Sequence, residues 1–70
     1  MAFVDTVAQR LAVAVFEQSQ ATEDPDLVEE VSKLIGTSSP TMQESFNTAI
    51  RYLRAEARAL ELMQNRMGSG

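Results

Sequence analysis

The sequence predicts an all-α fold of three helices, in which two shorter helices pack on one long C-terminal helix in a dimeric helical bundle. Apolar residues recur three and four positions apart in three segments, which is the spacing of one helix face. Only LAVAVF, at 11–16, has the β-branched character of a strand, and the chain offers no second strand to pair with it. We expect one helical domain at 1–67 and a flexible tail at 68–70.

The first helix is expected at residues 3–20. The members of its apolar stripe are Val4, Val7, Ala8, Leu11, Ala14 and Val15. Val13 and Phe16 widen this stripe, so the second half of the helix is apolar nearly all round.

A short second helix is expected to follow and to end at about Ile35. Asp24 suits the N-cap and Pro25 the first helical position, while Asp26 lies in the first turn, where the helix dipole favours a carboxylate. The apolar stripe of this helix consists of Leu27, Val28, Val31, Leu34 and Ile35. Gly36 is expected to end the helix, because glycine readily adopts the left-handed conformation of a helix terminus.

The third helix is expected to continue to Met67, because its segment RYLRAEARALELMQ contains no helix breaker and is rich in strong helix formers. Two registers are open for its start. In the first, Ser39 is the N-cap and Pro40 follows it. In the second, Thr41 and Glu44 form a capping box.

The third helix carries more apolar surface than the first two helices can cover. In a heptad frame the apolar positions are Phe46, Ala49, Ile50, Tyr52, Leu53, Ala57, Ala59, Leu60, Met63 and Met67, and Ala55 and Leu62 extend the apolar surface further. The helix spans roughly 40 Å, about the summed length of the other two, which can therefore cover one side but not two. We expect a symmetric homodimer to bury the second side, with a groove for a different protein as the alternative.

The association surface is expected to consist of Phe46, Ile50, Leu53, Leu60 and Met63. The four methionines, Met1, Met42, Met63 and Met67, are expected in the core, although methionine-rich surfaces also serve adaptable partner binding.

Arg51, Arg54 and Arg58 form a polar strip along the third helix. We expect a solvated face, since exposed rows of charge contribute little to stability. The strip is the candidate for polar recognition if it binds an acidic protein partner or nucleic acid. Nucleic acid is the weaker alternative, because the chain has a net charge of −4 and a pI of about 4.5.

Glu56 falls among the apolar heptad positions of the third helix. Its side chain is expected to reach the rim of the interface. The alternative is a pair with Arg10, or with an arginine of a second chain, that fixes the register of association. A catalytic role is disfavoured because no partner base or nucleophile is evident.

The composition excludes most chemistry. The chain has no Cys and no His, and Gly36 is its only internal glycine, so disulfides, thiolate metal sites, a histidine base and a phosphate loop are all excluded. The acidic segment at 23–30 lacks the spacing of a calcium loop. We expect no enzyme, no metal and no cofactor.

The sequence also disfavours a membrane partner. The longest apolar run, at 11–16, is far shorter than the about 20 residues of a membrane span, and the N-terminus lacks the basic residues of a secretory signal. We therefore expect a cytoplasmic interaction module, which acts as a regulator, adaptor or assembly subunit. The alternatives are a subunit of a larger helical assembly, such as a secretion or filament component, and a nucleic-acid-binding regulator.

Overall fold

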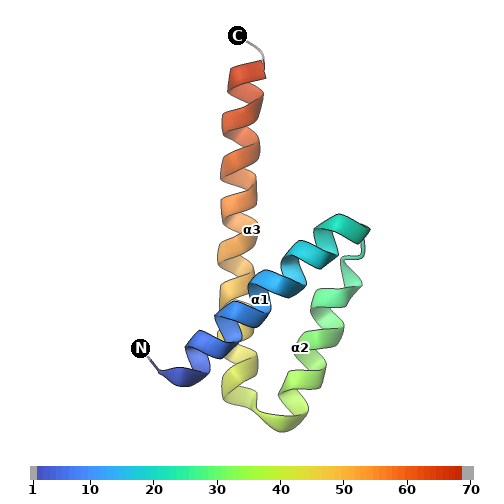
Figure 1. Ribbon diagram of the computed structural model, residues 1–70, viewed down its shortest axis with the longest axis vertical. Coiled ribbons are helices and arrows are strands. Elements are labelled where there is room, and N and C mark those ends of the chain that lie inside the picture. Colours follow the sequence, from blue (N-terminus) through green and yellow to red (C-terminus); the bar gives the residue numbers. More distant parts are fainter. Residues whose placement is uncertain (1, 69–70) are drawn as a thin grey trace.

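The computed structural model describes residues 2–68, which form three helices: α1 (Phe3–Thr22), α2 (Asp26–Ser38) and α3 (Pro40–Gly68). The predicted all-α fold, with two shorter helices on one long C-terminal helix, is confirmed. Helices α1 and α2 pack on the N-terminal part of α3, and the rest of α3 extends beyond them as a single helix (Figure 1). Gly68, which was expected in a flexible tail, belongs to α3, and residues 69–70 lie outside the described residues.

The core lies where α1 crosses α3. Its buried apolar cluster consists of Ala8, Ala12, Val15, Val28, Phe46 and Ile50. Ala8 and Ala12 are four residues apart and therefore share one face of α1. Neither has any exposed surface, and their small side chains leave room for Phe46, the only large side chain that is fully buried among the described residues. The crossing thus places two alanines of α1 against one aromatic ring of α3.

The corner between α1 and α2 is closed by hydrogen bonds across five residues. The hydroxyl of Ser19 donates to the carbonyl oxygen of Asp24 at 2.8 Å, and the backbone N–H of Asp24 donates to the carbonyl oxygen of Ser19 at 3.0 Å. Glu23 between them is left-handed, with φ 54° and ψ 42°. The prediction that Asp24 caps α2 is wrong: Pro25 is the N-cap, and no side chain caps the helix. The backbone N–H and carbonyl oxygen of Asp24 are both hydrogen-bonded to Ser19, which holds Asp24 in the turn before the helix.

Gly36 does not end α2, contrary to the sequence-based prediction. The helix continues to Ser38 and ends at Ser39, whose backbone is extended. Gly36 instead makes room for α3, since a Cβ atom at this position would lie 2.5 Å from Nε2 of Gln43. That nitrogen donates to the carbonyl oxygen of Ser32 at 3.0 Å, so glycine permits a side-chain bond between α3 and α2.

The start of α3 follows the first of the two registers. Ser39 accepts a hydrogen bond on its hydroxyl oxygen from the backbone N–H of Met42 at 3.1 Å, and the helix begins at Pro40. Further along, the hydroxyl of Ser32 donates to Oδ1 of Asn47 at 2.8 Å. Leu34, which was assigned to the apolar stripe of α2, is 70% exposed, because α3 covers only part of that stripe.

We predict that Phe46→Ala lowers the free energy of unfolding by about 3–5 kcal/mol, because it leaves a cavity at the helix crossing. Phe3→Ala is the matched control, since Phe3 is 83% exposed and should cost less than about 1 kcal/mol. Urea unfolding followed by circular dichroism measures both. Equal losses would mean that Phe46 is not the centre of the core.

We predict that Gly36→Ala is nearly neutral in the natural chain and stabilising by about 1 kcal/mol in a Gln43→Ala background. Alanine favours a helix interior by about 1 kcal/mol over glycine, but in the natural chain its Cβ displaces the Gln43 amide and removes a hydrogen bond of similar value. A double-mutant cycle of urea unfolding measures the coupling. The same gain in both backgrounds would contradict the close approach.

Candidate functional site

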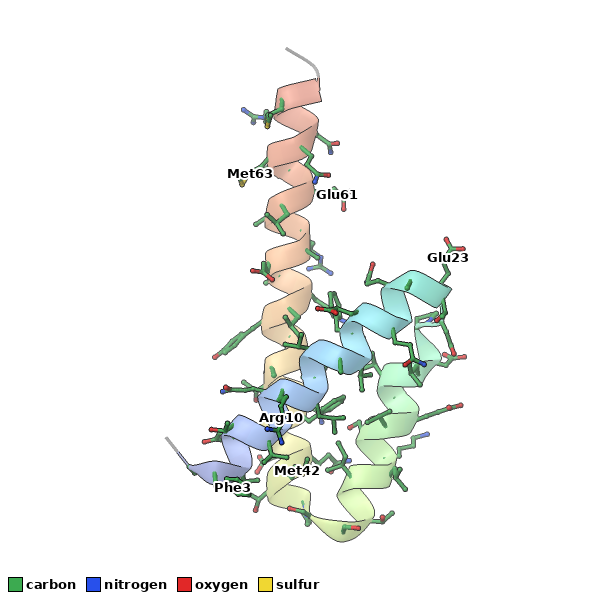
Figure 2. All side chains as sticks on the ribbon, viewed as in Figure 1. Phe3, Arg10, Glu23, Met42, Glu61 and Met63 are labelled. Carbon is green, nitrogen blue, oxygen red and sulfur yellow. The ribbon has the colours of Figure 1, made fainter. Side chains whose placement is uncertain are left out.

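Neither α1 nor α2 packs on the C-terminal part of α3, which extends past both of them (Figure 1). Three large apolar side chains on it, Leu60, Met63 and Met67, are 49%, 60% and 81% exposed. They recur three and four residues apart and therefore lie on one side of the helix, together with Ala59. Met63 and Glu61 project from opposite sides of α3 (Figure 2). We name Ala59, Leu60, Met63 and Met67 the exposed apolar face.

The structure separates the five residues predicted as the association surface. Phe46 and Ile50 are 0% and 2% exposed within the chain's own core, so their assignment to an interface between chains is wrong. The physical reason is that α1 covers this side of α3 with its two buried alanines. Leu53 is half-buried at the edge of the core, whereas Leu60 and Met63 are exposed. The heptad pattern marked apolar surface without indicating which side α1 would take.

The side of α3 that faces the core becomes polar where the helix extends past α1 and α2. At about 100° per residue, the line through Phe46, Ile50 and Ala57 continues into Glu61 and Gln64. The exposed apolar face does not follow this line. It continues a different one, which runs through positions 45, 49 and 52.

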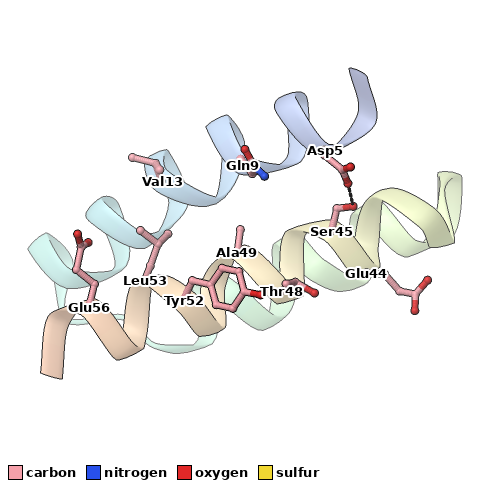
Figure 3. Close-up of a pocket in the computed structure, with 10 residues that line it drawn as sticks. All are labelled: Asp5, Gln9, Val13, Glu44, Ser45, Thr48, Ala49, Tyr52, Leu53 and Glu56. Atoms are coloured by element: carbon pink, nitrogen blue, oxygen red, sulfur yellow. Dashed lines mark hydrogen bonds between the residues drawn. The ribbon is translucent and has the colours of Figure 1, made fainter. Parts of the chain in front are cut away.

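That second line leads into an open groove of about 590 Å³ between α1 and α3 (Figure 3). The groove is lined by Asp5, Gln9 and Val13 of α1 and by Glu44, Ser45, Thr48, Ala49, Tyr52, Leu53 and Glu56 of α3. At one end, the Ser45 hydroxyl donates a hydrogen bond to Asp5 and ties the two helices together. Tyr52 is 73% exposed, so the groove opens beside an aromatic ring.

The groove combines an apolar floor with a negative rim. Val13, Ala49 and Leu53 supply apolar surface, and the lining holds three carboxylates but no basic side chain. Among the described residues, no group of three or more acidic side chains is placed to hold a metal ion. The chemistry that fits such a groove is an apolar segment that carries positive charge.

The arginine strip lies away from this groove. Arg51, Arg54 and Arg58 are exposed, and helical periodicity places them toward the side of α3 opposite the groove. A purely solvated role for the strip stays a prediction, and so does its alternative role in recognition.

Arg10 and Glu56 do not pair within one chain. Both side chains are exposed, and Glu56 lines the groove while Arg10 is not among its lining residues. A pair between Glu56 and an arginine of a second chain stays a prediction.

Like the predicted association surface, the predicted core methionines include one that the chain itself partly buries and others that are exposed. Met42 is half-buried against the core, but Met63 and Met67 are exposed, so the prediction of a core position is wrong for these two. Both lie on the part of α3 that extends past α1 and α2, where neither of these two helices packs on it (Figure 1). Met1 lies outside the described residues.

Comparison with protein-family models, curated proteins and solved structures finds no match for this chain. Across residues 2–68, none of the three helices combines the length and the apolar character that crossing a membrane requires.

Proposed function

We propose that this chain is a small, non-enzymatic interaction module of the cytoplasm, which acts as a regulator, adaptor or assembly subunit through the exposed apolar face of α3. The observation that carries the proposal is the exposure of Leu60, Met63 and Met67 on one side of an unaccompanied helix. Contiguous exposed apolar surface of this kind is typical of protein-binding sites.

The length of the free segment supports the same proposal. Residues 58–68 make three turns that continue α3 without packing on α1 or α2 (Figure 1). Most helical stability in proteins comes from packing of an apolar face. A partner that covers the exposed apolar face would therefore stabilise the segment as it binds.

The proposed partner is a second copy of the chain. A 70-residue domain without disulfides has little core to stabilise it, and oligomerisation is the usual remedy. Small proteins that associate with themselves most often form two-fold symmetric dimers. The proposed assembly is a homodimer of two 7.7 kDa chains.

Sedimentation equilibrium over a range of concentrations tests this proposal. We expect the natural chain to reach the mass of a dimer and Leu60→Gln/Met63→Gln to raise the dimer dissociation constant by about a hundredfold or more, because apolar contacts are lost. Glutamine keeps the helix propensity of the segment, so the helix itself should persist.

Leu62→Gln is the matched control. Leu62 is 57% exposed but lies off the exposed apolar face, about 100° round the helix from Met63, so its substitution should change association little. A natural chain that stays monomeric at high concentration would refute self-association. A mass that grows without limit would favour a larger helical assembly, and equal effects of both variants would refute the assigned face.

A further inference from the structure

We propose that the groove between α1 and α3 receives the C-terminal half of α3 from a second copy, which runs antiparallel to the first α3. This inference rests on the proposed self-association and adds its site, direction and register. Each copy would contribute both a groove and an insert, so two equivalent contacts would close the dimer.

The lengths of the two halves of α3 fit this arrangement. The groove is lined by α3 residues between Glu44 and Glu56, and the helix continues from Glu56 to Gly68. Each half covers twelve residue steps, or roughly 18 Å at 1.5 Å per residue. A two-fold axis near Glu56 therefore places the free half of each helix along the groove of the other copy.

The two halves also present the same side of α3. Ala49 and Tyr52 line the groove, and the exposed apolar face continues their line toward the C-terminus. A two-fold axis requires that both copies use the same surface. With the axis near Glu56, Met63 of the second copy comes level with Ala49, and Leu60 of the second copy comes level with Tyr52, beside the apolar floor.

Charge favours the antiparallel direction. The segment after Glu56 carries Arg66 near the exposed apolar face, whereas its one glutamate, Glu61, lies on the opposite side of α3. The groove lining carries three carboxylates and no basic residue. Arg66 of the second copy would lie within a turn of Glu44. A parallel dimer through the same side would instead bring the carboxylates of two grooves toward each other, which is destabilising.

Distances between spin labels test the direction and register. The chain contains no cysteine, so Thr41→Cys and Gln64→Cys each provide a single labelling site at an exposed position. In the antiparallel dimer, the two Thr41 sites are separated by about 45 Å along the helix and the two Gln64 sites by about 24 Å. In a parallel dimer, both pairs would be separated by about one interhelical distance of 8–10 Å, plus the label arms.

The outcomes separate this inference from the proposed function. Dimeric mass with two short, similar distances would overturn the antiparallel arrangement and leave self-association standing. Monomeric mass without dipolar coupling between labels would overturn both. Dimeric mass with distances near 45 and 24 Å would support both.

Glu56→Gln provides a second test, because the proposed axis brings the two Glu56 carboxylates together. Removing this repulsion should lower the dimer dissociation constant roughly tenfold. Glu61→Gln is the matched control: it removes the same charge from the opposite side of α3 and should have a smaller effect. Equal effects of the two variants, measured by sedimentation equilibrium at one ionic strength, would overturn the position of the axis.

Discussion

The fold depends on the close crossing of α1 over α3, where Ala8 and Ala12 meet Phe46 and Ile50. Larger residues at either alanine position would hold the two helices apart and expose the aromatic ring. This contact also determines which side of α3 packs into the core. Because α1 crosses α3 at an angle and then diverges from it, the C-terminal half of α3 is left with an apolar side of its own (Figure 1).

Helical periodicity and turn residues were sufficient to predict the three helices and their order. They failed where a contact with the next or the preceding helix decided the outcome. Gly36 is typical of a helix terminus, but here its lack of a side chain leaves room for the side-chain amide of Gln43 in the next helix. Asp24 has the signature of an N-cap, but a buried serine holds its backbone. In both cases a contact with a neighbouring helix replaced the local preference of the residue.

The association surface was only half predictable for a related reason. A heptad pattern shows how wide an apolar stripe is, but the division between internal and external sides depends on where another helix crosses. Two alanines four residues apart on α1 lie at the crossing, yet alanine is also a common helix former and gives no unique signal. The groove could not be predicted, because its lining comes from two helices far apart in the sequence.

The continuity of α3 has a consequence for how its free half becomes ordered. Starting a helix is costly, whereas adding residues to an existing one is cheap. The half anchored at Phe46 supplies the nucleus from which the free half propagates, with no glycine or proline in between. Loosening of the core would therefore unravel the outer turns as well, so that only a correctly folded chain displays its methionines in a helical array.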